Sequence, residues 1–257
     1  MRAIRSLENL YKLQRKFGIA QALAMTTSLL GRKPVPVKYE GEKFLVNPEA
    51  ATAYHLLNSI DKIRDLVKYI PSGNNQLILD VGANCGIFSL LARRRFPDSE
   101  IYAFEPSARL KKILEENFTS RNITLVPKAV TNYNGYINYF VNPQSEQTNS
   151  VVESSISEFA QAFLQESVEC ISLSSFLHEL GREKVDVLKL DVQGAESLIV
   201  KDLKENFQNI KNLIVEVVFF DENIFELIDS VRALFPYYKF INPVYAGADL
   251  FFSKQPL

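Results

Sequence analysis

The sequence predicts an α/β fold, a doubly wound and mostly parallel seven-stranded sheet that ends in an antiparallel hairpin. From about residue 75 onward, apolar runs of strand length alternate with amphipathic stretches of helical period. Strands that alternate with helices imply parallel neighbours joined by right-handed crossovers. The last two apolar runs are separated only by residues 242–248, which is too short for a crossover and therefore predicts the hairpin.

The length of 257 residues suits one large domain with a small N-terminal appendage. The net charge of -1 gives no overall basic excess, so we expect no nucleic-acid partner. We find neither a signal-peptide run nor an apolar run near the roughly 20 residues that span a bilayer. Cys85 and Cys170 are too few for a disulfide framework or a zinc cluster. These features predict a cytoplasmic protein without a transmembrane segment, and they leave a homo-oligomer open.

Residues 1–74 form the predicted helical and hairpin appendage, and residues 75–257 form the main domain. Apolar residues at spacings of three and four predict a helix over residues 1–30, and the other side of this helix is basic. We interpret the basic side as the solvated face of a helix packed on the main domain. The alternative is a helix that faces a membrane surface or a polyanion. The appendage continues with a hairpin over 35–38 and 43–46 and a helix over 49–69.

Predicted strands and predicted helices alternate along the main domain, which supports the fold class. The predicted strands of the sheet are Leu77–Val81, Ile101–Phe104, Ile123–Val130, Val185–Leu190, Leu213–Phe220, Tyr238–Ile241 and Asp249–Ser253. The predicted helices between them are Ile87–Phe96, Ala108–Ser120, Ala195–Phe207 and Ile224–Phe235.

A polar insert interrupts this alternation at residues 142–168, between the strand-like runs Tyr136–Val141 and Val168–Leu173. Because it follows the third parallel strand, we expect it to cover the carboxyl edge of the sheet, where ligands bind in such folds. The predicted contacts to a hydroxyl-rich acceptor in this insert are Thr148, Asn149 and Ser150.

The central motif is a buried strand that runs into a glycine-bearing turn, followed by the start of a helix. Gly82 allows the sharp turn, and Gly86 would allow the backbone to approach a ligand closely. The helix N-terminus offers N–H groups to an anionic group such as a carboxylate. Asp80, at the strand end, could accept a hydrogen bond from an amine or a water.

This turn departs from the dinucleotide fingerprint Gly-x-Gly-x-x-Gly, because Asn84 and Ile87 occupy the second and third glycine positions. A pyrophosphate needs bare backbone at the second glycine, whereas the amino-acid end of S-adenosylmethionine tolerates a side chain there. Glu105 lies 19 positions after Gly86, at the end of the next strand. A carboxylate there can accept hydrogen bonds from both ribose hydroxyls, although a lone Glu at a strand end can also be a helix cap.

Four segments, Asp80–Gly86, Ala103–Pro106, Ala129–Val130 and Leu188–Glu196, together resemble the FkbM-type methyltransferases, over roughly residues 75–253. The resemblance implies a Rossmann-like class I methyltransferase that uses S-adenosylmethionine, largely for O-methylation of sugar and polyketide hydroxyls. It places the methionine part at the glycine-bearing turn, the ribose at Glu105 and the adenine at the end of the third strand. The implied cofactor contacts are Asp80, Gly82, Ala83, Asn84, Gly86, Phe88, Glu105, Pro106, Ala129 and Val130.

Three charged residues in apolar strands are the candidate catalytic residues. Alternation places Lys189 and Asp191 on one side of their strand, and Glu216 lies within another apolar strand. Ionised groups there are costly unless they are paired or face a cleft, so Lys189 is either half of a buried ion pair or a site residue. Asp191 or Glu216 would supply a general base or position the acceptor. No spacing suggests dedicated metal ligands, although carboxylates alone could recruit Mg²⁺.

The sequence therefore predicts a methyltransferase that uses S-adenosylmethionine as cofactor and methylates an oxygen of a glycan or another small-molecule acceptor. Two alternatives stay open. One is a non-catalytic scaffold that only binds the cofactor. The other is an NAD-dependent oxidoreductase, which the substitution of Asn84 for glycine disfavours.

Overall fold

The computed structural model describes residues 11–47, 50–143, 148–157, 162–203, 209–218, 224–244 and 247–257. Its strands are β1 (Val35–Tyr39), β2 (Glu42–Val46), β3 (Leu77–Val81), β4 (Glu100–Phe104), β5 (Ile123–Val126), β6 (Ala129–Thr131), β7 (Gly135–Val141), β8 (Leu164–Ser172), β9 (Val185–Leu190), β10 (Ile210–Val218), β11 (Tyr237–Val244) and β12 (Gly247–Ser253). Its helices include α2 (Ile19–Leu30), α3 (Ala50–Tyr69), α4 (Ile87–Arg95), α5 (Ala108–Phe118), α6 (Glu153–Ser157), α7 (Leu173–Glu179), α8 (Glu196–Asp202) and α9 (Ile224–Arg232).

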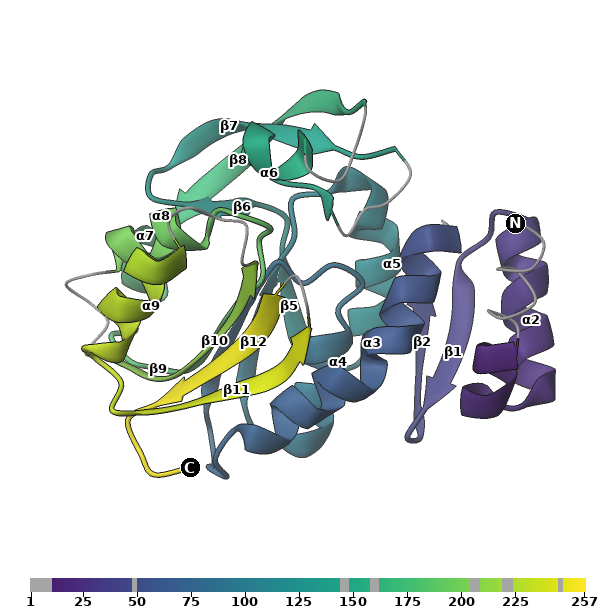
Figure 1. Cartoon of the computed structure of the whole chain (residues 1–257), viewed down its shortest axis with the longest axis horizontal. Helices are drawn as coiled ribbons and strands as arrows, with labels where there is room; N and C mark the ends of the chain where they lie inside the picture. The colour runs from purple at the N-terminus through teal and green to yellow at the C-terminus, as the bar shows by residue number, and fades with distance from the viewer. Residues whose placement is uncertain are drawn as a thin grey trace.

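The centre of the molecule is a seven-stranded sheet with the order β11-β12-β10-β9-β3-β4-β5 (Figure 1). β3 is parallel to β4 and β9, and the pairs β4–β5 and β9–β10 are also parallel. β12 is antiparallel to both of its neighbours, β10 and β11. The doubly wound sheet with a C-terminal hairpin is therefore confirmed, and the last strand of the chain lies inside the sheet rather than at its edge.

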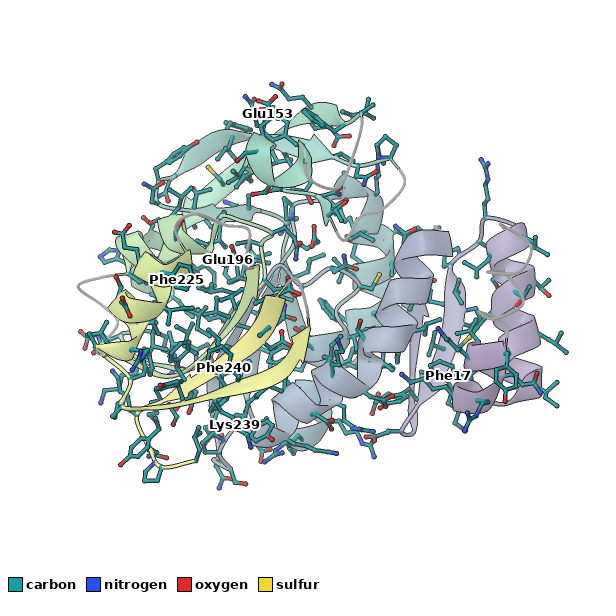
Figure 2. All side chains as sticks on the ribbon, in the orientation of Figure 1. Phe17, Glu153, Glu196, Phe225, Lys239 and Phe240 are labelled. Atoms are coloured by element: carbon teal, nitrogen blue, oxygen red, sulfur yellow. The ribbon has the colours of Figure 1, made fainter. Side chains whose placement is uncertain are left out.

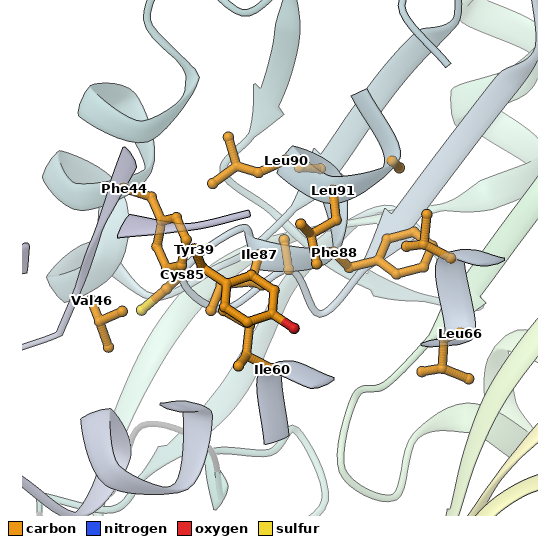
Figure 3. Packing of buried hydrophobic residues seen from close by; sticks show 14 of the residues in the cluster. Tyr39, Phe44, Val46, Ile60, Leu66, Cys85, Ile87, Phe88, Leu90 and Leu91 are labelled. Atoms are coloured by element: carbon orange, nitrogen blue, oxygen red, sulfur yellow. The ribbon is translucent and has the colours of Figure 1, made fainter. Parts of the chain in front are cut away.

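Two hydrophobic cores fill the two faces of this sheet. On one face the buried cluster joins strand residues such as Ile78 and Val187 to α3, α4 and α5. Figure 3 shows part of this cluster, in which Ile60 of α3 and Ile87 of α4 are both buried. On the other face, the alternate strand residues pack against α7, α8 and α9. The sheet is thus covered on both sides, as parallel sheets require.

The N-terminal segment differs from the single helix expected over residues 1–30. Residues 1–10 lie outside the described part, and the helix over residues 11–17 is separated from α2 by Gly18, whose φ is 82°. A positive φ is incompatible with a continuing α-helix and favours glycine, which explains the break. α2 packs beside the hairpin β1–β2, and Asn117 of α5 hydrogen-bonds both backbone groups of Leu45 at 2.7 and 2.8 Å.

Within the described residues, no helix is long and apolar enough to cross a membrane.

The expected strand Ile123–Val130 is wrong as one element. β5 ends at Val126, and β6 belongs to a second, three-stranded sheet with the order β6-β8-β7. Pro127 separates the two strands and has no N–H to continue the ladder, while the N–H of Lys128 turns back to the Val126 carbonyl at 2.8 Å. Ala129 and Val130 therefore lie in the second sheet and not at the end of the third strand of the main sheet.

Candidate active site

The loop between β3 and α4 is fixed by the end of β4. The N–H groups of Gly82 and Ala83 both donate to the Phe104 carbonyl, at 3.1 and 2.9 Å. Gly82 has a φ of 79°, and a Cβ at this position would overlap the carbonyl oxygen of Asp191. Glycine is therefore required here by the close approach of the ends of β3 and β9 as well as by the turn.

Glu105 joins this loop to the start of α5. Its Oε2 accepts the N–H of Asn84 at 2.9 Å, and its Oε1 accepts the N–H of Ser107 at 3.0 Å. Asn84 has a φ of 50°, and its side-chain oxygen accepts the N–H of Cys85 at 2.8 Å. Gly82 and Asn84 are partly exposed, whereas Ala83 and Glu105 are buried. The glycine-bearing turn and Glu105, which the sequence predicts to act together, are thus in direct contact.

Gly86 and Phe88 face the protein interior. A Cβ on Gly86, whose φ is 79°, would lie 2.5 Å from the ring of Phe118, so this glycine allows α4 and α5 to pack closely. Phe88 is buried in the hydrophobic cluster between α4 and its neighbours (Figure 3). The N-cap residue of α4 is Gly86, which has no side chain to accept hydrogen bonds from the first-turn N–H groups of the helix.

A buried ion pair lies directly beneath the loop. Register pairs Asp80 of β3 with Lys189 of β9, and the Lys189 ammonium lies 3.1 Å from Asp80 Oδ1 and 3.2 Å from Asp191 Oδ2. The ammonium also donates to the Gly82 carbonyl at 3.2 Å, and Ser89 donates to Asp80 Oδ2 at 2.7 Å. Burial alone would lower the pKa of Lys189, but the two carboxylates raise it above its ordinary value. The Lys–Asp pair considered from the sequence is therefore present, and it links Asp80 to Asp191.

Asp191 and Glu216 form a carboxyl pair at the carboxyl ends of β9 and β10. The Gln193 amide donates to Asp191 Oδ1 at 2.9 Å and to Glu216 Oε2 at 2.6 Å. The neighbouring Asp191 charge and then burial raise the pKa of Glu216 well above its ordinary value. Burial would raise the pKa of Asp191 too, but Lys189 and the hydrogen bonds from its neighbours lower it. Of the two carboxyl groups, Asp191 therefore loses its proton at the lower pH, and the Asp191 side chain is 33% exposed.

Glu196 supports the segment that carries Gln193. Figure 2 marks the place of Glu196; the two oxygens of its carboxylate accept the N–H groups of Val192 and Gly194, each at 2.9 Å. Burial raises the pKa of Glu196 to about 7, although these hydrogen bonds lower it. Gln193 has a φ of 58°, a left-handed conformation that the two hydrogen bonds hold in place. Glu196 therefore shapes the loop after β9.

The polar insert lies on this same loop. Ser150 donates its hydroxyl to the Gln193 carbonyl at 2.8 Å, and a Cβ on Gly194 would overlap Ser155 of α6. This agrees with the expectation that the insert covers the carboxyl edge of the sheet. Residues 144–147 and 158–161 lie outside the described part.

The three residues chosen as acceptor contacts make internal hydrogen bonds. Asn149 accepts the N–H of Asn142 at 2.8 Å, and Thr148 accepts from the Asn142 amide at 2.9 Å. Asn149 and Ser150 are buried, whereas Thr148 is partly exposed. A direct contact of any of the three with an acceptor stays a prediction.

Three residues without a role predicted from the sequence, Gln193, Ser89 and Asn117, hydrogen-bond the loop or the carboxyl groups of the site. Asn117 donates to the carbonyls of Leu45 and Cys85, at 2.8 and 2.9 Å, and so joins the hairpin to the loop. Polar residues on the buried faces of α4 and α5 are the signal that could have found Ser89 and Asn117. Gln193 carries no such signal, because only the register of β9 and β10 brings its neighbours together.

The sheet order and the site define a class I, Rossmann-like methyltransferase. A family model described as the methyltransferase FkbM domain matches residues 80–241, more than half of the chain. The chain therefore belongs to the FkbM methyltransferase family, a family of S-adenosylmethionine-dependent enzymes.

Relatives and a solved structure agree with this assignment. The chain is similar to Methyltransferase 1 of Beauveria bassiana (strain ARSEF 2860), at 29% identity over 192 residues, 66% of this chain and 76% of that protein. It is also similar to the 2-O-methyltransferase NoeI of Sinorhizobium fredii (strain NBRC 101917 / NGR234), at 26% identity over 169 residues, 62% of this chain and 69% of that protein. The solved structure of the METTL16 MTase domain matches with a TM-score of 0.50 and 15% identity, covering 94% of this chain and 82% of that chain. At this identity, the match shows similarity of fold alone.

Proposed function

We propose that this protein transfers a methyl group from S-adenosylmethionine to a hydroxyl oxygen of a carbohydrate or another small hydroxylated acceptor. One observation carries the proposal: the partly exposed carboxylate of Asp191 shares the Lys189 ammonium with Asp80 and with the Gly82 carbonyl of the loop. A base beside a methyl donor is what a hydroxyl acceptor needs, because the hydroxyl loses its proton during transfer. The similarity to a 2-O-methyltransferase supports the same choice of atom.

The residues of the loop fit the proposed cofactor. S-adenosylmethionine, when bound, supplies an electrophilic methyl group. The partly exposed Gly82 and Asn84 would hold the methionine part, and the uncapped N-terminus of α4 would favour its carboxylate. The carboxylate of Glu105 accepts the N–H groups of Asn84 and Ser107, and it would also accept hydrogen bonds from the ribose hydroxyls. Pro106, Ala129 and Val130 remain proposed contacts of the sugar and base.

Asp191 is the proposed general base. Lys189 keeps the Asp191 pKa below its ordinary value, so Asp191 is ionised and accepts hydrogen bonds at neutral pH. Gln193 holds both carboxyl groups and fixes their orientation. Asp191 would therefore orient the acceptor hydroxyl and take its proton, a contribution of roughly 10²–10⁴-fold. Asp80 and Lys189 would act through Asp191, because Asp80 is fully buried.

The proposal is tested with radiolabelled S-adenosylmethionine and a panel of glycans and small hydroxylated acceptors. We expect methyl transfer to at least one acceptor, and a rate about 10²–10⁴-fold lower in Asp191→Asn. Asp98→Asn, at an exposed aspartate outside the site, is the matched control and should keep the wild-type rate. A wild-type rate in Asp191→Asn would contradict the role of this carboxylate.

The same panel separates the two alternatives. A non-catalytic scaffold would bind the cofactor and methylate no member of the panel. An NAD-dependent oxidoreductase would bind NAD in a calorimetric titration, which we do not expect because Asn84 occupies the position where a pyrophosphate needs glycine.

A further inference from the structure

The outermost helix, α2, has an apolar exposed face. Ile19, Leu23 and Leu30 are 62%, 57% and 83% exposed, and their spacing places them on one side of the helix. Ala22 and Met25, on the opposite side, are buried. α2 contains no charged residue at all, although an exposed helix face is normally polar. Large side chains gathered on one exposed face mark an interaction surface.

Basic residues surround this face. Residues 9–39 contain six Lys or Arg and no Asp or Glu. Because the whole chain carries -1 and this segment +6, the rest of the chain carries -7. Lys12 and Arg15 precede α2, Arg32 and Lys33 follow it, and all four are exposed. The apolar face therefore has cations at both ends, on a segment whose charge is opposite to that of the rest of the chain.

We propose that α2 docks this protein on an anionic membrane surface, with Ile19, Leu23 and Leu30 entering the boundary between headgroups and acyl chains. Lys12, Arg15, Arg32 and Lys33 then contact the lipid phosphates. This combination of an apolar face and flanking cations is that of a helix lying in the membrane interface. In Figure 1, α2 lies at one end of the molecule, with β1 and β2 between it and the helices of the main domain.

Two other occupants fit the surface less well. A second copy bound through α2 about a two-fold axis would bring two basic segments together without acidic partners, and like charges repel. A nucleic acid would meet the cations at the helix ends, but it offers no counterpart for three exposed aliphatic side chains on a face without charge. An anionic bilayer offers acyl chains to the apolar face and phosphate groups to the cations.

The test is flotation of the full chain with vesicles of phosphatidylcholine, either pure or mixed with equal phosphatidylglycerol. We expect binding to the anionic vesicles and little to the neutral ones. Ile19→Gln, Leu23→Gln and Leu30→Gln combined should weaken this binding roughly tenfold or more. Lys12→Gln with Lys33→Gln should also weaken it roughly tenfold, and added salt should do the same to the wild type.

Phe225→Gln is the matched control, because Phe225 on α9 is 74% exposed and lies at the other end of the molecule from α2 (Figure 2). It should bind vesicles like the wild type, and circular dichroism and urea midpoints check that all variants fold. Three results would overturn the proposal: no wild-type binding to anionic vesicles, unchanged binding in the triple variant, or a dimer in light scattering that the triple variant abolishes without any vesicle binding. Methyl transfer does not enter the readout, so this test is independent of the proposed function.

Discussion

The proposed cofactor side and the proposed acceptor side of the site are built in different ways. On the cofactor side, consecutive residues of one loop bond to the end of the adjacent strand and to Glu105. On the acceptor side, Asp191, Glu216, Gln193 and the insert come from separate parts of the chain and meet only in the folded protein. The cofactor side depends on backbone geometry, whereas the acceptor side depends on side-chain hydrogen bonds between distant segments. Each half therefore fails under a different substitution.

The largest effect is expected at Gly82. In Gly82→Ala the new Cβ would overlap the Asp191 carbonyl, so the ends of β3 and β9 must separate. We expect a loss of about 3 kcal/mol or more in the free energy of unfolding, measured by urea denaturation.

Gly41→Ala is the control for this substitution, because Gly41 has a φ of 89° but no atom within 4 Å of a Cβ. It introduces the backbone strain alone and should cost only about 1–2 kcal/mol. Equal losses in the two variants would mean that the contact with Asp191 has no special importance.

A smaller effect is expected at Glu196, on the acceptor side. The amide in Glu196→Gln has one oxygen, so it cannot accept both the Val192 and the Gly194 N–H. We expect a loss of about 1–3 kcal/mol in the free energy of unfolding at pH 8, where the wild-type carboxyl is ionised. Glu116→Gln, at an exposed position of α5, should cost almost nothing. A loss no larger than that of Glu116→Gln would contradict the supporting role.

The smallest effect concerns pH and Glu216. The pKa of this carboxyl is raised in the folded protein, so its contribution to stability is complete below the ordinary value of 4.5 and is lost as pH rises above it. Glu216→Gln removes that titration. The free energy of unfolding of the wild type, relative to this variant, should fall by up to about 1.4 kcal/mol per pH unit between pH 5 and 7. A difference that stays constant over this range would mean that the pKa of Glu216 is not raised in the folded protein.

The sheet and the contact between the loop and Glu105 were predictable from the sequence because their signals are local. Strand and helix periods indicated the order of elements, and the turn at Gly82 and the acid at 105 were recognisable by spacing. Lys189 was expected in a buried ion pair or in the site, and the structure gives its partners as Asp80 and Asp191. Local pattern was insufficient at Pro127, where one apolar run divides between two sheets, and at Gly18, where a positive φ interrupts a helical period.

The acceptor half was predictable only in part. Asp191 and Glu216 stood out as charges in apolar strands, but their shared neighbour Gln193 was ordinary in the sequence. The Thr148–Ser150 segment was predicted to contact the acceptor. Two of its three side chains, those of Asn149 and Ser150, are buried and make hydrogen bonds within the protein. Hydrogen bonds between distant segments depend on how the strands pair in the folded protein, and a short stretch of sequence does not reveal that pairing.

Calorimetric titration with S-adenosylhomocysteine tests the central claim, that one half of the site binds the cofactor and the other activates the acceptor. We expect that the wild type binds S-adenosylhomocysteine and that Asp191→Asn binds it with close to wild-type affinity. Glu105→Ala should bind roughly tenfold more weakly or worse, because the ribose loses a charged hydrogen-bond acceptor. No binding by the wild type, or a loss in Asp191→Asn with none in Glu105→Ala, would contradict it.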